Sequence, residues 1–354
     1  MKTVYVLGNG QLGRMLRQAG EPLGITVYPI GFDAKADTLP IAQSVITAEI
    51  ELWPETALTS ELVQHSNFVN RDIFPYLADR LTQKQLLDRL QLATAPWQLL
   101  KDENEWPHIF SSLGNLVIIK PRTGGYDGRK QWRLSKDKTT LLPNKCYGEY
   151  IVEKIINFSA EISLIGARGY DGCTVFYPLT HNLHQEGILR TSVAFPQPDQ
   201  MQQAQAERML STIMHELKYI GVMAMECFVT PNGLIINELA PRVHNSGHWT
   251  QNGASISQFD LHLRAVLGLP LSQPVILAPS VMLNLIGVSI NNDWLKQPLV
   301  HLHWYDKEVR PNRKVGHFNL TDSDSKRLTI ALKELVTILP PEYSSSISWA
   351  IDKF

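Results

Sequence analysis

The chain has 354 residues, of which 44% are hydrophobic, and its 33 basic and 34 acidic residues leave a net charge of −1. This length is sufficient for a large core divided among two or three domains. The balanced charge gives no global field that would attract nucleic acid or an anionic membrane, so we expect neither partner. The three cysteines, Cys146, Cys173 and Cys227, form no CxxC pair, and no stretch is a signal peptide or an apolar membrane span. These features fit a reducing compartment, and we expect a cytoplasmic protein.

The N-terminal segment carries a glycine pattern after an apolar run. In VYVLGNGQLGRML, Gly8, Gly10 and Gly13 follow G-x-G-x-x-G, and Asp33 stands twenty positions beyond Gly13. In dinucleotide-binding proteins such glycines receive a pyrophosphate at a helix N-terminus, and the later acid binds a ribose hydroxyl. A nicotinamide-dependent oxidoreductase is therefore one reading, although this pattern alone is a weak signal.

Three regions follow one another along the chain. Residues 1–98 alternate apolar strands with helices, as in a parallel sheet covered on both faces. Residues 99–157 contain short β-rich runs around a glycine-rich turn. Residues 158–354 are strand-rich, with helices predicted near 201–217 and 326–339. We expect a Rossmann-like domain, a small β-rich domain and a larger α+β domain with a β-rich C-terminal extension.

A lysine and several glycines stand together in VIIKPRTGGYDGRKQW. Lys120 ends an apolar strand, and Gly124, Gly125 and Gly128 follow it. Glycines let backbone N–H groups approach an anion closely, so the segment fits a lid over phosphates. The alternative is an ordinary hairpin with a surface lysine, and G-x-x-x-x-G-K-[ST] is missing.

Two carboxylates lie within apolar strands, in AMECFVT and INELAPR. Glu226 and Glu238 belong to neighbouring strands joined by a PNG turn, and Asn237 supplies a neutral oxygen beside them. Charged residues are seldom buried unless they are paired or bind a metal. Two such carboxylates suit Mg²⁺, which completes its shell with water and phosphate oxygens. Solvated acids at exposed strand edges are the alternative.

Polar residues are dense directly after Glu238, in LAPRVHNSGHW. An arginine, an amide and a hydroxyl beside a metal-phosphate site suit an anionic substrate. The histidines His244 and His248 could instead bind zinc, but no cysteine or HExxH context supports that. A further basic run, WYDKEVRPNRKVGH, is either a phosphate clamp or a solvated loop; its cations are Lys307, Arg310, Arg313 and Lys314.

Together these motifs resemble the ATP-grasp superfamily, and within it the N5-carboxyaminoimidazole ribonucleotide synthetase family. The similarity covers essentially the whole chain, through GNGQLGRML, ITAEIE, ADRLTQK, RTGGYDGR, ELAPRVHNSGHW and HWYDKEVRPNRKVGH. Lys130 and Asn312 stand where the family usually has glycine. The resemblance implies an ATP-grasp fold with a Rossmann-like pre-ATP-grasp domain, a small lid and a larger C-terminal α+β domain. It also implies that the GNGQLG turn lines a ribonucleotide site and binds no nicotinamide cofactor.

The resemblance further implies a distribution of site residues. Those expected at the nucleotide are Arg80, Lys120, Gly124, Gly125, Tyr126, Asp127, Gly128, Arg129, Lys130, Gln131, Glu153, Lys154, Ile155, Ile156, Glu161, His184, Asn237 and Glu238. Those expected at the ribonucleotide are Gly10, Gln11, Leu12, Glu49, Ile50, Tyr126, Asp127, Lys307, Arg313 and Lys314. Those expected at bicarbonate or in catalysis are Arg242, His244, Asn245, Ser246 and Asp127. The metal ligands would be Glu226 and Glu238.

The implied activity is ATP- and Mg²⁺-dependent carboxylation of 5-aminoimidazole ribonucleotide by bicarbonate in purine biosynthesis, with ADP and phosphate as products and carboxyphosphate as intermediate. The resemblance also implies a homodimer. Three alternatives stay open. One is another ATP-grasp ligase, such as a formate-dependent ribonucleotide transformylase or a D-alanine-type ligase. The second is the nicotinamide-dependent oxidoreductase, and the third is a binding protein that holds ATP without turnover.

Overall fold

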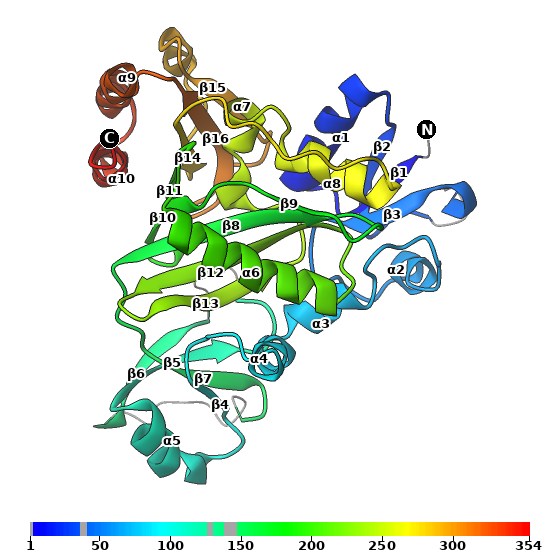
Figure 1. Cartoon of the computed structure of the whole chain (residues 1–354), viewed down its shortest axis with the longest axis vertical. Coiled ribbons are helices and arrows are strands. Elements are labelled where there is room, and N and C mark those ends of the chain that lie inside the picture. Colours follow the sequence, from blue (N-terminus) through cyan, green and yellow to red (C-terminus); the bar gives the residue numbers. More distant parts are fainter. Residues whose placement is uncertain (1–2, 36–40, 126–129, 138–146) are drawn as a thin grey trace.

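The computed structural model describes residues 3–35, 41–125, 130–137 and 147–354, and these residues form three sheets (Figure 1). The N-terminal sheet has the order β2–β1–β3, and all its pairs are parallel. Its strands are β1 (Val4–Leu7), β2 (Val27–Ile30) and β3 (Val45–Ala48). Every residue of β1 and β3 is buried, as expected for a parallel sheet covered on both faces.

Four helices accompany this sheet and lead to the next: α1 (Gln11–Gly20), α2 (Ala57–Leu62), α3 (Ile73–Ala78) and α4 (Arg80–Arg89). Helix α1 leaves β1 through a turn in which Gly8 has φ of 111°, a conformation that favours glycine. Helix α4 begins at an Asp79 side chain that accepts from the Leu81 N–H. The α4 residues Leu86 and Leu87 are fully buried in a core shared with the large sheet.

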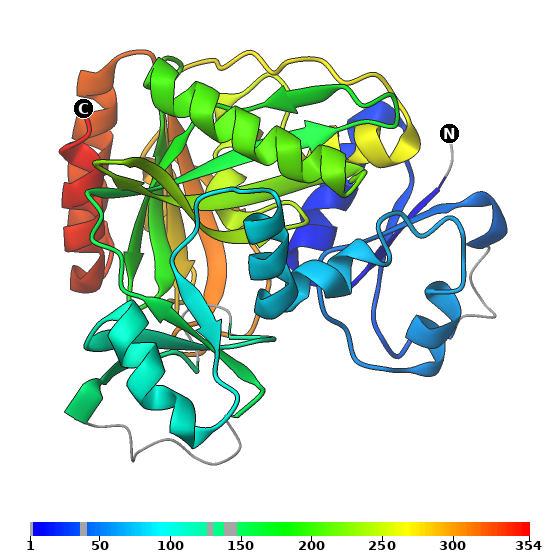
Figure 2. The same ribbon diagram turned by 60° about the horizontal axis from the view of Figure 1, so that its bottom comes forward.

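The small sheet is antiparallel and has the order β4–β7–β5–β6 within the described residues. Its strands are β4 (Trp97–Leu99), β5 (Leu116–Pro121), β6 (Trp132–Ser135) and β7 (Tyr150–Lys154), and α5 (Trp106–Leu113) covers one face. It projects from the rest of the molecule (Figures 1 and 2). Strand β5 lies next to β7 and carries Lys120 near its end.

In the part of the chain that the structure describes, nine antiparallel strands form the large sheet. They run in the order β13–β12–β8–β10–β11–β14–β16–β15, with β9 beside β8. They are β8 (Ala160–Arg168), β9 (Thr174–Phe176), β10 (Thr180–Gln185), β11 (Ile188–Ala194), β12 (Gly221–Thr230), β13 (Gly233–Ala240), β14 (Ser280–Ile286), β15 (His301–Trp304) and β16 (Lys314–Thr321). The sheet is continuous from the middle of the chain into its C-terminal part, so the basic run between β15 and β16 belongs to the same scaffold as Glu226 and Glu238.

Helices cover the large sheet on both sides (Figure 2). They are α6 (Gln200–Glu216), α7 (Thr250–Gly253), α8 (Gln258–Leu267), α9 (Ser325–Ile338) and α10 (Ser344–Ile351). Helix α6 packs on β8 and β13, whereas α8 packs on β12 and β8 and also touches α1. One hydrophobic core therefore includes Met15 of α1, Val222 of β12 and Phe259 of α8. The N-terminal region is joined to the large sheet through this core.

The predicted mixed helix and sheet content is confirmed, with differences of detail. The apolar run at residues 67–70 forms no strand and makes a single bridge between Phe68 and Ile46. The sequence reading did not include α5, α8, α10 or β10. Strand β10 was missed because its sequence THNLHQ is polar; Asn182 is buried there and bonds to Ser163 and Ser192. We keep the division at residues 98 and 157 as a proposal. Among the described residues, no helix is both long and apolar enough to cross a membrane.

His262 of α8 fastens the N-terminal sheet to the large sheet. Its Nδ1 accepts from the Val222 N–H at 3.1 Å, and its Nε2 lies 2.9 Å from Thr47 Oγ1. The ring is 1% exposed, and burial lowers its pKa from 6.5 to about 4. The accepting Nδ1 requires the neutral ring.

We predict that this histidine makes stability depend on pH. Because the pKa is lower in the folded state, its contribution is complete above pH 6.5 and is lost as the pH falls towards 4. Between about pH 7.5 and pH 5, the wild type should lose about 2 kcal/mol more free energy of unfolding than His262→Gln. Urea denaturation of both proteins measures this, and equal losses would contradict it.

Candidate active site

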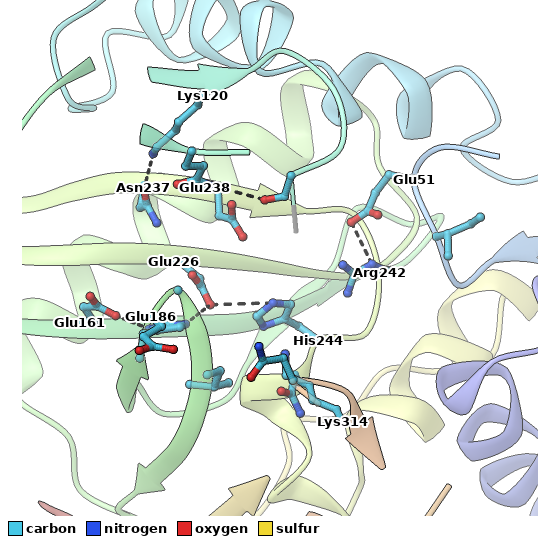
Figure 3. Close-up of a pocket in the computed structure, with 18 of the residues that line it drawn as sticks. Glu51, Lys120, Glu161, Glu186, Glu226, Asn237, Glu238, Arg242, His244 and Lys314 are labelled. Atoms are coloured by element: carbon cyan, nitrogen blue, oxygen red, sulfur yellow. Dashed lines mark hydrogen bonds and ion pairs between the residues drawn. The ribbon is translucent and has the colours of Figure 1, made fainter. Parts of the chain in front are cut away.

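A cavity of about 840 Å³ lies where the three regions meet, and its wall is strongly charged (Figure 3). The N-terminal region contributes the start of α1 and the segment after β3. The small sheet contributes β5 and β6, and the large sheet contributes β8, β12, β13 and the basic run before β16. Lining residues predicted from sequence are Gln11, Leu12, Glu49, Ile50, Lys120, Gly125, Gln131, Glu161, His184, Glu226, Asn237, Glu238, Arg242, His244, Asn245, Lys307, Arg313 and Lys314. Side chains more than two hundred positions apart thus share one cavity.

The predicted pair of carboxylates is confirmed as a cross-strand pair. Glu226 of β12 and Glu238 of β13 are register partners, and a bulge follows Glu226. Both line the cavity together with Glu161 of β8. Burial, with repulsion from Glu238, raises the pKa of Glu226, and the nearby His184 only partly offsets this. The neutral form of Glu226 is therefore favoured unless a further cation binds beside it.

His184 of β10 is the cation that stands among these carboxylates. Its Nδ1 is hydrogen-bonded to Glu161, and its Nε2 lies 3.8 Å from Glu226 Oε1. Burial opposes its protonation, but Glu226 and Glu161 outweigh burial and raise the pKa to about 9. His184 is consequently protonated at neutral pH.

These oxygen donors fit a magnesium ion whose remaining ligands come from the phosphates of a nucleotide and from water. Glu226 and Glu238 supply carboxylate oxygens, and Asn237 adds an amide oxygen to the same wall. Among the described residues, no group of three or more His, Cys, Asp or Glu side chains is arranged to hold a metal by itself. Mg²⁺ commonly takes one or two carboxylates and completes its shell with phosphate oxygens and water, whereas structural zinc needs four protein ligands. The zinc reading of the histidines gains no support.

Lys120 lines the cavity, and its ammonium group contacts the side chains of Glu153 and Asn237. Its Nζ lies 2.7 Å from Glu153 Oε2 and donates to Asn237 Oδ1 at 3.2 Å. The other oxygen of Glu153 lies 2.9 Å from Nζ of Lys84 on α4. Burial alone would raise the pKa of Glu153, but Lys120 and Lys84 lower it to about 2. Glu153 is therefore an ionised side chain between two lysines.

Arg80 holds the backbone at the start of the glycine-rich segment. Its guanidinium donates to the carbonyls of Pro121 at 2.8 Å and Gly124 at 2.6 Å. Gly124, Gly125 and Lys130 have φ of 71°, 76° and 57°, so the lysine occupies the left-handed region that favours glycine. The remaining predicted members of the segment lie outside the described residues: Tyr126, Asp127, Gly128 and Arg129.

The polar run after β13 is fixed by partners from several elements. Arg242 Nε lies 2.8 Å from Glu51 Oε1, in a pair that is at most 14% exposed. Burial, together with Arg242 and Lys314, lowers the pKa of His244 well below its usual value, so its ring is neutral. Asn245 exchanges amide hydrogen bonds of 2.6 and 3.0 Å with Asn284. These side chains need little rearrangement to meet a ligand.

Ser246 is placed differently from the prediction. It is fully buried and does not line the cavity. Its hydroxyl is 2.8 Å from Ser163 Oγ and 2.9 Å from Nδ1 of His244, whose Nε2 points towards Glu226. The structure thus brings Ser246 to His244 and not to the cavity.

The glycine-rich turn is already occupied by a carboxylate from the same chain. Gly13 N–H donates to Glu49 Oε2 at 2.6 Å, and Gly10 N–H donates to the other oxygen of Glu49. These are the donors that a pyrophosphate would need at a helix N-terminus. Glu49 also lies within 3 Å of where a Cβ on Gly8 or Gly10 would stand. The glycines are needed for this carboxylate, so the nicotinamide reading of G-x-G-x-x-G is not supported.

Three of the four cations of the basic run line the cavity near this turn, whereas Arg310 is exposed and paired with Glu308. Lys307 donates to Gln11 and lies 5.9 Å from the ring centroid of Tyr305. Burial, with repulsion from Arg313, lowers the pKa of Lys307. Lys307, Arg313 and Lys314 line the cavity, Lys307 next to α1, and their role as a phosphate clamp stays a prediction.

Several predicted residues do not line the cavity: Gly10, Arg80, Gly124, Lys130, Glu153, Lys154, Ile155, Ile156 and Ser246. Lining residues that the sequence reading missed are Glu51, Ile118, Trp132, Arg133, Phe158, Glu186, Gly187, Leu189, Phe228, His248 and Asn312. The sequence suggested His248 only as a zinc ligand, and Asn312 only as a departure from glycine. The Phe158 and Phe228 rings stack at 4.4 Å, and Phe158 is still 44% exposed. An exposed aromatic beside a charged cavity is a signal of ligand contact that sequence alone does not display.

Comparison with known proteins gives one consistent picture. The chain matches the Ribonucleotide synthetase preATP-grasp domain over residues 1–78, the ATP-grasp domain over 85–259 and the Phosphoribosylaminoimidazole carboxylase C-terminal domain over 280–330. It is 72% identical to the N5-carboxyaminoimidazole ribonucleotide synthase of Escherichia coli, with both chains covered completely. The crystal structure of N5-carboxyaminoimidazole ribonucleotide synthetase from Thermus thermophilus has a TM-score of 0.86 at 35% identity, covering 95% of this chain and 98% of that one. An ADP complex of the Staphylococcus aureus synthetase has a TM-score of 0.83 at 29% identity, covering 94% and 96%. The ATP-grasp fold expected from the motifs is confirmed.

Asn312 offers a test of the backbone in the basic run. It has φ of 60°, which asparagine tolerates and a β-branched residue strongly disfavours. We expect Asn312→Val to lower the free energy of unfolding by about 1–2 kcal/mol and Asn312→Gly to change it by less than about 0.5 kcal/mol. Denaturation curves of the two variants compare them, and equal stability would contradict the assigned backbone conformation.

Proposed function

The chain belongs to the N5-carboxyaminoimidazole ribonucleotide synthase family, the ATP-grasp ligases of purine biosynthesis, and from this premise we propose how its cavity carries out the ATP-dependent carboxylation. The acceptor is 5-aminoimidazole ribonucleotide, the product is the N5-carboxy derivative, and ATP and Mg²⁺ are required. The observation that carries the proposal is one cavity whose carboxylate pair, polar cluster around Arg242 and basic end lie together. The alternative of a formate-dependent transformylase is not favoured by the relatives.

The carboxyl donor in our proposal is bicarbonate. Its carbon bears no good leaving group, so it must be activated. A bicarbonate oxygen attacks the γ-phosphorus, the bond to the β-phosphate oxygen breaks, and ADP leaves, which gives carboxyphosphate. The ribonucleotide amine then forms a bond to the carboxyl carbon while phosphate departs with its electron pair, and the amine proton is released. Positioning and charge neutralisation are the protein's main contributions to such phosphoryl transfer.

The nucleotide is assigned to the side where the small sheet faces the large one. Lys120 would contact the phosphates, and Glu161 would accept hydrogen bonds from the ribose. Ile118, Phe158 and Phe228 supply apolar surface for the base close to Glu161, which is the register partner of Phe228. The backbone of residues 153–156 is the expected hinge beside the base.

Glu226 and Glu238 are proposed to hold the metal against the phosphates. When bound, Mg²⁺ would neutralise phosphate charge and polarise the γ-phosphoryl group. Glu161, Glu226 and Glu238 supply carboxyl groups at this end of the cavity, and protonated His184 stands between Glu226 and Glu161. The charge of these residues is thereby matched to a metal-nucleotide complex and not to a free anion.

Bicarbonate is assigned to the neighbouring polar cluster. Arg242 supplies the positive charge and is oriented by Glu51. Neutral His244 and Asn245 supply further polar contacts, with Ser246 positioning His244 from behind. This revises the direct contact that the sequence predicted for Ser246.

The ribonucleotide is assigned to the basic end. Lys307, Arg313 and Lys314 would bind its phosphate, and Gln11, Leu12, Glu49 and Ile50 would line the remaining surface. Tyr126 and Asp127 keep the roles that the family implies and lie outside the described residues. The cytoplasmic location and the homodimer are carried forward as proposals from the family.

Removing one metal carboxylate tests the assignment to Glu238. Glu238→Gln keeps the shape of the side chain and removes its charge, so phosphate release should fall by at least about 10²-fold, while the thermal midpoint stays near that of the wild type. Steady-state phosphate assays at saturating Mg-ATP measure this. Unchanged turnover would rule Glu238 out as a metal ligand.

Phosphate release also tests the reaction itself. Mg-ATP and bicarbonate are supplied with and without 5-aminoimidazole ribonucleotide, and we expect release to depend strongly on the ribonucleotide. ATP binding without any stimulation would show a different acceptor, and formate with glycinamide ribonucleotide would then be supplied instead. Omitting bicarbonate is the matched control for the carboxyl donor.

A further inference from the structure

A buried lysine stands behind the phosphate-binding end of the cavity. Lys84 is 2% exposed, does not line the cavity, and has its Nζ 2.6 Å from Thr94 Oγ1 and 2.9 Å from Glu153 Oε1. Burying an ammonium group is costly, and substrates do not reach this one. The reaction as described above gives it no task.

We propose that Lys84 is a positioning residue that sets the charge presented to ATP, by neutralising Glu153 so that the positive charge of Lys120 is available to the phosphates. The inference rests on the proposed function, in which Lys120 contacts the phosphates. It assigns a role in substrate affinity to a residue that touches no substrate.

The geometry of the three groups supports this role. The Glu153 carboxylate lies between the two lysines and gives one oxygen to each, at 2.9 Å and 2.7 Å. Two ammonium groups and one carboxylate leave a net charge of +1. Without Lys84 the remaining pair would be neutral, and ATP would meet a lysine whose charge is cancelled by its own partner.

Because Glu153 is buried, removing its ion pair with Lys84 is energetically costly. Its side chain is 4% exposed, and its strand is paired on both sides, with Trp97 of β4 and Ile118 of β5 as register partners. The carboxylate is therefore held in place when Lys120 turns to a phosphate. With Lys84 present it keeps one cation; without it, a buried carboxylate would be left unpaired, which is strongly unfavourable.

Helix α4 connects this role to the rest of the site. Arg80 and Lys84 stand four residues apart, on one face of the helix. Arg80 holds the carbonyls of Pro121 and Gly124, just beyond Lys120, while Lys84 holds Glu153. The same helix thus fixes both the backbone and the charge of the phosphate-binding end.

The test compares proteins with different net charge in this cluster. They are the wild type (+1), Lys84→Met (0), Glu153→Gln (+2) and the double variant (+1), with Lys84→Arg as a charge-preserving control. The dissociation constants of Mg-ATP and of adenosine, which has no phosphate, are measured by calorimetry on folded protein.

Lys84→Met should weaken ATP binding by at least about tenfold. The double variant should return to within about threefold of the wild type, Glu153→Gln should not bind ATP more weakly, and Lys84→Arg should stay near the wild type. Adenosine should bind to Lys84→Met and Lys84→Arg within about threefold of the wild type, since neither substitution lies in the hinge beside the base.

The inference would be overturned if the double variant bound Mg-ATP no more tightly than Lys84→Met. If Lys84 only packs the interior, the double variant loses more contacts and should bind ATP no better than Lys84→Met, and adenosine binding should fall as well. If Lys84→Met does not fold, Glu153→Gln and the double variant decide, because weaker ATP binding in both contradicts the charge account. Ribonucleotide-dependent phosphate release by the wild type is measured separately, so a failure of the proposed function is distinguished from a failure of this inference.

Discussion

The structure depends on one electrostatic constraint: Glu226 and Glu238 are opposite one another on neighbouring strands, and both line the cavity. Two carboxylates in this position repel each other and lose hydration, as the raised pKa of Glu226 shows. Positively charged residues lie near this pair. His184 is protonated beside Glu226, and Lys120 donates a hydrogen bond to Asn237, the residue before Glu238 in the chain. The cavity is anionic where a metal-nucleotide complex is expected and cationic where free anions are expected.

A second consequence is that the site requires all three regions of the fold. Glu51 follows the N-terminal sheet yet orients Arg242 beyond β13, and Lys84 of α4 reaches Glu153 of the small sheet. Glu49 holds the glycine turn so that the start of α1 faces Lys307. These contacts are buried, and buried polar groups with fixed partners pre-organise a site before a ligand arrives. The residues that line the cavity are therefore held by partners from all three regions.

The sequence was informative where chemistry conflicted with its surroundings. Glu226 and Glu238 could be predicted because charged residues inside apolar strands need an explanation, and a PNG turn between the strands indicates their pairing. Lys130 and Asn312 have φ of 57° and 60°, the region that favours glycine, and the resemblance had marked both as positions where glycine is usual. The glycine pattern near the N-terminus was misleading by itself, because its donors bind Glu49, which is thirty-six residues from Gly13.

The unpredicted features are those that depend on packing between distant segments. Nothing in ADRLTQK distinguishes Lys84 from a surface lysine of an amphipathic helix, and nothing in VHNSGHW shows that Ser246 faces inward while His244 faces the cavity. Burial and partner identity are decided by how α4 and β13 meet the other sheets, and local propensity does not encode that. For the same reason Phe158 and Trp132 join the cavity without any motif.

The central claim is that this cavity joins bicarbonate to the γ-phosphoryl group before the carboxyl reaches the amine. The most direct measurement supplies ¹⁸O-labelled bicarbonate with Mg-ATP and 5-aminoimidazole ribonucleotide and determines the mass of the released phosphate. Our account predicts one oxygen from bicarbonate in each phosphate, because the attacking bicarbonate oxygen stays with phosphorus when carboxyphosphate breaks down. Phosphate without label would contradict the account and would show that water, and not bicarbonate, attacks ATP.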